Sequence, residues 1–94
     1  MKEAIIDGLV AKSMTDIHDI LSTSLGFPDY YGRNFSALWD CLSTDVERPA
    51  KIRIINSSVL EKNIGEDYKK LIIVLKKIKQ YDAPLEEKIT VTVE

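Results

Sequence analysis

Three short aliphatic runs set the main constraint on how this chain can fold. They are KEAIID at 2–7, KIRIIN at 51–56 and KITVTV at 88–93, and each has the length and composition of a β-strand. Helical patterns fill the stretches between them, and strands that alternate with helices are typical of a parallel sheet. The sequence therefore predicts an α/β fold, with a three-stranded parallel sheet packed against three to four helices.

The first helix has clear start and stop signals. Apolar side chains recur at helical spacing from Met14 to Leu25. Ser13 and Asp16 resemble a capping box at the start, and Gly26 supplies a C-terminal stop. We therefore expect this helix to begin directly after Ser13.

The second helix is expected to begin at Asn34, a good N-cap residue, and to run to about Ser43. Its apolar residues share one face, with Trp39 at the edge, because a helix turns about 100° per residue. They are Phe35, Leu38, Trp39 and Leu42. Further along the chain, a brief helix is expected to end near Asn63 and a longer one at Asp82.

Chain length and cysteine content limit the class of protein. Ninety-four residues, 45% of them hydrophobic, suit one domain spanning residues 1–94. The single cysteine, Cys41, has no partner for an intrachain disulfide, which indicates a reducing compartment. The N-terminal stretch MKEAIIDG has only a three-residue apolar run, too short for a signal peptide core, and the longest aliphatic run, LIIVL at 71–75, is too short for a membrane span. We therefore expect a cytoplasmic protein that does not associate with membranes, and nothing requires more than a monomer.

The charge distribution favours a basic partner. Residues 1–50 contain four Lys or Arg and eight Asp or Glu, whereas residues 51–94 contain nine and seven. This balance lacks the basic excess of a nucleic-acid-binding surface, so no nucleic acid is expected as a partner. The negative surplus in the first half is suited to a positively charged protein.

Catalytic machinery is not evident in the sequence. His18 is the only histidine and is expected at the surface or boundary of the first helix, and Cys41 is expected to be a small, partly buried hydrophobic residue. There is no metal-ligand spacing and no glycine-rich phosphate loop. We therefore expect neither an enzyme nor a cofactor or metal, although carboxylates brought together by folding stay open as catalytic groups.

Five of the seven aromatic residues lie within GFPDYYGRNFSALWDCL, residues 26–42. A loop seldom points two adjacent side chains in one direction, so one of Tyr30 and Tyr31 should face solvent. Trp39 is expected to be half core and half surface, as interface anchors often are. Asp40 lies on the polar face, where it is either a solvated aspartate or part of an interface.

Two motifs in this segment, PDYYGRN and SALWDCL, resemble the signature of the barstar family, intracellular inhibitors of the secreted ribonuclease barnase. The similarity extends over most of the chain, from the opening strand and Gly8 to the closing strand. It implies a parallel sheet packed with helices, in which the loop and second helix from Tyr30 to Asp45 enter a ribonuclease active site. The implied partner is therefore a protein, a small basic ribonuclease.

The resemblance also implies roles for individual residues. Asp40 matches the position whose carboxylate takes the place of the RNA phosphate, and Tyr30 matches the aromatic that covers the catalytic histidine. The barstar–barnase pair is itself the standard case of this charge complementarity, so the expectation is taken from the family. The expected partner-binding residues are Tyr30, Gly32, Asn34, Ser36, Trp39, Asp40, Thr44, Asp45 and Lys77.

The sequence departs from the family pattern at four positions. Acidic residues of the family fall at Ser36, at Arg33 and at about Lys77, and an aromatic falls at Asp45. A cognate ribonuclease with a charge pattern unlike that of barnase would explain these changes. The alternative is a barstar-like protein-binding module with a non-nuclease partner.

Overall fold

The computed structural model describes all 94 residues and contains the predicted parallel sheet. Strands β1 (Lys2–Asp7), β2 (Ala50–Ile55) and β3 (Ile89–Val93) are ordered β1-β2-β3, and both neighbouring pairs are parallel. In the register of the first pair, Ala4 of β1 lies opposite Ile52 of β2. The fold predicted from the three aliphatic runs is therefore confirmed.

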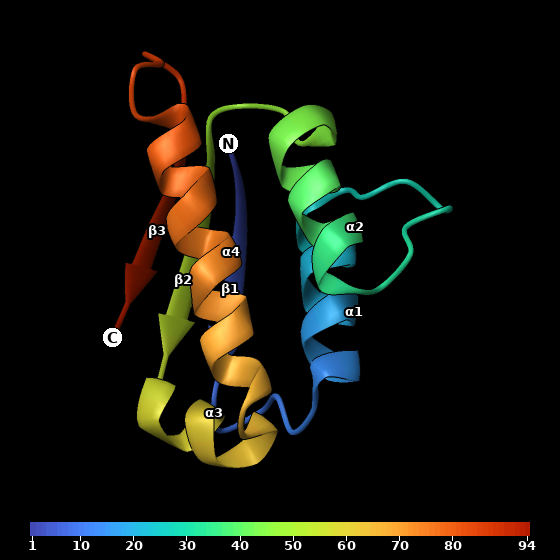
Figure 1. Ribbon diagram of the computed structural model, residues 1–94, viewed down its shortest axis with the longest axis vertical. Helices are drawn as coiled ribbons and strands as arrows, with labels where there is room; N and C mark the ends of the chain where they lie inside the picture. Colours follow the sequence, from blue (N-terminus) through green and yellow to red (C-terminus); the bar gives the residue numbers. More distant parts are fainter.

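Four α-helices accompany the sheet: α1 (Met14–Leu25), α2 (Phe35–Asp40), α3 (Ser57–Ile64) and α4 (Asp67–Asp82). Figure 1 shows α4 lying across one face of the sheet, with α1 and α2 next to each other beyond β1 and α3 at the carboxyl end of the strands. None of these helices combines the length and the apolarity that a membrane-spanning segment needs.

The expected signals at both ends of α1 are present. The Ser13 hydroxyl accepts a hydrogen bond from the Asp16 amide, and Gly26 adopts φ +70° while its N–H donates to Ser22. The carboxylate of Asp16 accepts from the Lys12 amide at 2.8 Å rather than from Ser13, so the capping box is only half formed. The helix nevertheless begins and ends where the sequence predicted.

The second helix differs from its prediction. It was expected to run as one α-helix from Asn34 to about Ser43, but the α-helix ends at Asp40 and a π-helical turn follows over Cys41–Asp45. The Val46 amide donates to the Cys41 carbonyl five residues back, which is the bond that defines a π-helix. This wider turn continues the helical segment to Asp45.

The sheet buries only one of its faces. Alternate side chains point to opposite faces of a strand, and Ala4, Ile6, Ile52 and Ile54 are all fully buried against the helices. The intervening positions are exposed or partly exposed in every strand. The hydrophobic core therefore lies between the sheet and the helices, and the other sheet face is open.

A buried ion pair joins the connection between the π-helical turn and β2 to α4 and β3. Asp82, whose side chain is 0% exposed, accepts from Arg48 Nε and Nη2 at 2.9 Å each and from the Ile89 amide at 2.8 Å. Arg48 also donates to the carbonyls of Val46 and Leu42. Burial opposes ionisation of Asp82, but these hydrogen bonds and the Arg48 charge outweigh it and lower its pKa.

Replacing Asp82→Asn should destabilise the protein by about 3 kcal/mol, because it leaves a buried guanidinium without its counter-charge. Urea unfolding at pH 7 measures the change. The matched control is Glu94→Gln, which breaks the exposed pair with Arg53 and should cost about 0.5 kcal/mol or less. Equal losses in the two variants would contradict a structural role for the buried pair.

Candidate functional site

The loop between α1 and α2 projects from the body of the molecule (Figure 1). Tyr31 anchors it, with a side chain only 9% exposed that packs edge-on against Phe27 at a ring-centroid distance of 4.8 Å. Its hydroxyl lies 2.6 Å from Nδ1 of His18 on α1. Tyr30 points the other way and is 81% exposed, so the prediction that one of the two tyrosines faces solvent is confirmed.

The contact between His18 and Tyr31 is a hydrogen bond between neutral groups. Burial raises the pKa of Tyr31 to about 12, and burial together with the nearby Arg33 charge lowers the pKa of His18. The tyrosine therefore keeps its proton at neutral pH and donates it to Nδ1 of an uncharged imidazole. The expectation of His18 at the surface is wrong, because the side chain is 6% exposed and helps to hold the loop.

Arg33 fixes the loop at a second point. Its Nη2 lies 2.8 Å from Oδ1 of Asp19 and 3.2 Å from the Thr15 carbonyl, both on α1. Its backbone has φ +56°, in the left-handed region that few non-glycine residues adopt. The loop is thus tied to α1 on both sides of the glycine at position 32, without a disulfide.

Two of the predicted contact residues also have local structural roles. The side-chain oxygen of Asn34 accepts from the Ala37 amide at 2.8 Å, which confirms Asn34 as the N-cap of α2. A Cβ placed on Gly32 would lie 3.2 Å from the Cβ of Ala37, so the glycine lets the loop pack closely on the helix. Ser36, in the first turn of α2, is exposed.

Trp39 links α2 to α4. It is partly buried, as predicted, and its ring packs edge-on against Tyr81 at a centroid distance of 5.4 Å. Lys77 Nζ lies 4.7 Å from the centroid of the same ring, within the range of a cation–π interaction. The fold thus brings Lys77, which the resemblance assigned to the partner-binding surface, to the Trp39 ring. Tyr81, one helical turn beyond Lys77, was not among the predicted residues.

The carboxylate of Asp40 is free of internal partners. Asp40 is exposed, and it takes part in none of the three salt bridges of the chain. These salt bridges use all three arginines and join Arg33 to Asp19, Arg48 to Asp82 and Arg53 to Glu94. A negative charge that stands at the end of α2 without an internal cation is available to a cation on another molecule.

The π-helical turn carries the remaining predicted residues. Thr44 and Asp45 are both exposed, and the Thr44 hydroxyl donates to the backbone carbonyl of Asp40. Cys41 is buried, and burial, with the charge and hydrogen bond of Asp45, raises the pKa of its thiol to about 11. Such a thiol stays protonated at neutral pH, which is the state expected of a small core residue.

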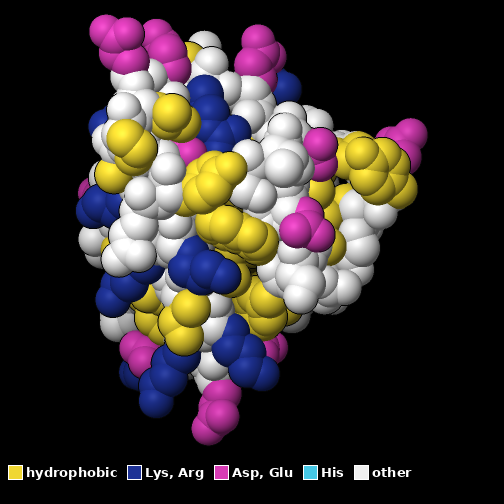
Figure 2. Space-filling model, turned by 45° about the horizontal axis from the view of Figure 1, so that its top comes forward, with side chains coloured by type: hydrophobic (Ala, Val, Ile, Leu, Met, Phe, Trp, Pro, Cys, Tyr) yellow, Lys and Arg dark blue, Asp and Glu magenta, His cyan; other side chains and the backbone are white.

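The predicted residues therefore lie on the projecting loop, on α2, on the π-helical turn and on α4. Figure 2 shows hydrophobic side chains gathered between α4 and α2, with Lys and Arg side chains among them and separate acidic side chains toward the α2 side. No group of three or more His, Cys, Asp or Glu side chains is placed to hold a metal ion. The arrangement is a mixed aromatic and charged surface suited to contact with a protein.

Comparison with known proteins relates the chain to a family of inhibitors. The family model described as Barstar (barnase inhibitor) matches residues 1–94, the whole chain. A Bacillus subtilis (strain 168) protein named "Putative ribonuclease inhibitor YrdF" is 46% identical over 56 residues. These residues are 60% of this chain and 62% of that protein, so the match spans less than two thirds of the relative's length. With the parallel sheet and the loop sequence, the full-length family match shows that the chain belongs to the barstar (barnase inhibitor) family.

Proposed function

We propose that this protein is a cytoplasmic inhibitor of a barnase-like ribonuclease, that it has no catalytic activity of its own, and that it blocks the enzyme with the segment Tyr30 to Asp45. The Asp40 carboxylate takes the place of an RNA phosphate in the enzyme's cleft. The observation that supports this proposal most directly is that Asp40 is exposed and free of internal cations on a segment held by buried contacts. Its partner is a small basic enzyme, and one inhibitor molecule binds one enzyme molecule.

The chemistry of ribonucleases favours this mechanism. An enzyme that binds RNA holds the phosphate with cationic side chains, and a carboxylate accepts the same charge-assisted hydrogen bonds. Tyr30, exposed at the tip of the loop, supplies a rigid aromatic surface with one polar end that can cover an imidazole. Trp39 stands beside Asp40 and contributes apolar area to the same contact.

The partner is expected to differ from barnase in charge pattern. Ser36 carries no charge where the family has an acid, and Lys77 places a cation on the Trp39 ring. Asp45 adds a carboxylate where the family has an aromatic residue. A cognate enzyme therefore presents an acidic group near Lys77, and barnase itself is inhibited more weakly than the cognate enzyme.

The inhibition experiment mixes the purified protein with barnase and with barnase-type ribonucleases from its own source organism, and measures RNA hydrolysis. At least one enzyme from that source should be blocked at a one-to-one ratio, and added salt should weaken the complex because charge pairs dominate it. If every enzyme in the panel keeps its activity, the inhibitor proposal is wrong. The alternative of a non-nuclease partner, which the changes at Ser36 and Lys77 favour, would then take its place.

Replacing Asp40→Ala should weaken inhibition of the cognate ribonuclease by about a hundredfold or more, because a buried cation of the enzyme loses its counter-charge. Ser36→Ala, on the same exposed side of α2, is the matched control and should change inhibition by less than about threefold. Neither variant should alter the urea midpoint, since both side chains are exposed. Equal small effects would show that the phosphate-mimicking site is placed wrongly.

The anchor of the loop should make stability depend on pH. The pKa of His18 is lower in the folded state than its ordinary value of 6.5, so the unfolded chain takes up the proton first as the pH falls. The free energy of unfolding should therefore decrease below about pH 6.5 and be fully retained above it. His18→Asn keeps a hydrogen-bond acceptor near the position of Nδ1 but cannot take up the proton, so its free energy of unfolding should fall less between pH 7 and pH 5, as measured by urea titrations. If the free energy of unfolding of both proteins falls equally over this range, His18 is not the group responsible.

A further inference from the structure

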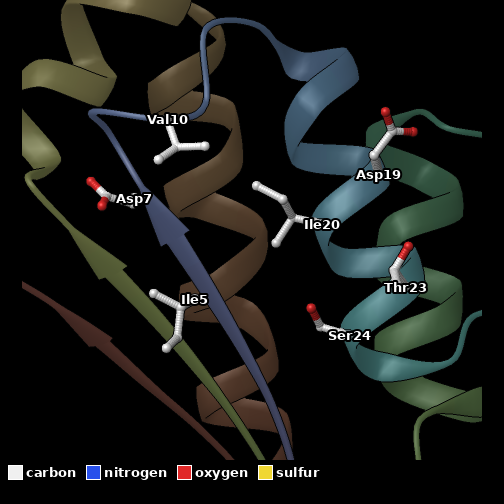
Figure 3. A pocket seen from close by; sticks show the side chains of 7 residues that line it. All are labelled: Ile5, Asp7, Val10, Asp19, Ile20, Thr23 and Ser24. Atoms are coloured by element: carbon white, nitrogen blue, oxygen red, sulfur yellow. The ribbon is translucent and has the colours of Figure 1, made fainter.

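A groove of about 480 Å³ lies between β1 and α1. Ile5 of β1 and Ile20 of α1 lie on its two sides, with Val10 at one end and the carboxylates of Asp7 and Asp19 at the rim (Figure 3). Ile5 is 43% exposed and Val10 is 66% exposed. Figure 3 shows α1 between β1 and α2, and no residue of α2, the π-helical turn or α4 lines the groove, so it is separate from the surface proposed to bind a ribonuclease.

The strand beside this groove has hydrogen-bonding groups without a partner strand. β1 is the first strand of the sheet and pairs only with β2. The Gly8 amide donates to the Ile55 carbonyl at 2.9 Å, so the even-numbered residues of this strand direct their N–H and C=O groups toward β2. Successive residues alternate, and the N–H and C=O groups of Glu3 and Ile5 therefore face away from the sheet. An edge of this kind is a template for one more strand.

The side chains along this edge define what such a strand must carry. Glu3, Ile5 and Asp7 share the open face of the sheet, because Ala4 and Ile6 are buried on the other face. A strand paired with the edge would place one residue opposite each of them, and opposite charges favour such pairs. The complementary five-residue strand therefore has a cationic residue at positions one and five and an aliphatic residue at position three, and positions two and four can be any residue. This pattern is the same in either strand direction.

The same side chains disfavour a second copy of this chain. Antiparallel pairing of two β1 edges about Ile5 would set Glu3 of one copy opposite Asp7 of the other, twice in each dimer. Like charges directly opposite each other destabilise a strand pair. In the sheet itself, Glu3 lies opposite Lys51 of β2, so a cation on its other side continues an alternation of charge across the sheet.

We infer that the β1 edge and its groove bind an extended segment of a partner protein. This segment has an aliphatic residue at its centre, and a Lys or Arg two positions before it and two positions after it. The segment adds a fourth strand to the sheet. Its backbone bonds to Glu3 and Ile5, its aliphatic side chain covers Ile5, and its cations face Glu3 and Asp7, whereas the Asp19 carboxylate at the rim is already paired with Arg33.

A peptide titration tests this inference. The ¹⁵N-labelled protein is titrated with acetyl-Thr-Lys-Thr-Val-Thr-Lys-Thr-amide and followed by NMR, with the peptide in which both lysines are replaced by glutamate as the control. The amide signals of Glu3 and Ile5 should shift, and their hydrogen exchange should slow. The acidic peptide should bind at least about fivefold more weakly. If the basic peptide causes no shift at these amides up to millimolar concentration, or both peptides bind equally, the inference is wrong.

Two variants separate the backbone and charge contributions. Ile5→Pro removes an outward N–H at an edge position that tolerates proline, and Glu3→Lys reverses one charge. Each should weaken the basic peptide by at least about fivefold. Thr90→Lys, on the open face of β3, is the control and should leave binding unchanged. If the Ile5→Pro variant does not fold, the binding of the basic peptide to Glu3→Lys alone tests the inference. If the Glu3 and Ile5 signals shift with protein concentration and no peptide, a second copy occupies the edge and the partner-strand inference is overturned.

Discussion

The hydrogen bond between the buried Tyr31 hydroxyl and His18 determines how the rest of the candidate site is presented. It joins the loop to α1, and Arg33 adds a second connection to the same helix through Asp19. Because Tyr31 is fixed inward, the adjacent Tyr30 must point outward. A loop that is ordered before binding loses less conformational entropy in a complex, which raises affinity without any further contact.

The distribution of charge gives the site its chemical character. Each arginine has an internal carboxylate partner, and in the pair formed by Arg48 and Asp82 the carboxylate is fully buried and the guanidinium is largely buried. Two charged groups near Trp39, the carboxylate of Asp40 and the ammonium group of Lys77, have no counter-charge within the chain. The three arginines are thus paired with other carboxylates, and Asp40 has no salt-bridge partner within the chain.

The sequence predicted the parts of the structure that depend on local patterns. The aliphatic runs, the Asn34 cap and the Gly26 stop each act over a few residues, and each appears where it was expected. The π-helical turn was missed because its bonding depends on how the segment packs against α4, which lies far along the chain. Burial of His18 was missed because its partner, Tyr31, lies on another element. For the candidate site, the sequence predicted Asp40 on the polar face of its helix and one of Tyr30 and Tyr31 in solvent. Which tyrosine is exposed depends on the contact with His18, and the contact of Trp39 with Tyr81 required the packing of α2 on α4.

Opposite charges on one rigid surface restrict how a partner can dock. In the proposed complex, Asp40 lies among the cations that bind RNA, so Lys77, which is on the neighbouring Trp39 ring, meets the same strongly positive cleft unless an acidic group stands near it. Lys77 rests on the Trp39 ring, whose π face lowers the cost of holding the ammonium group at this place. A rotated enzyme would bring Lys77 to the phosphate site and Asp40 to the acidic group, and both contacts would be repulsive. In this proposal the pair selects one orientation and rejects enzymes that lack the acidic group, so specificity depends on a repulsive element as much as on an attractive one.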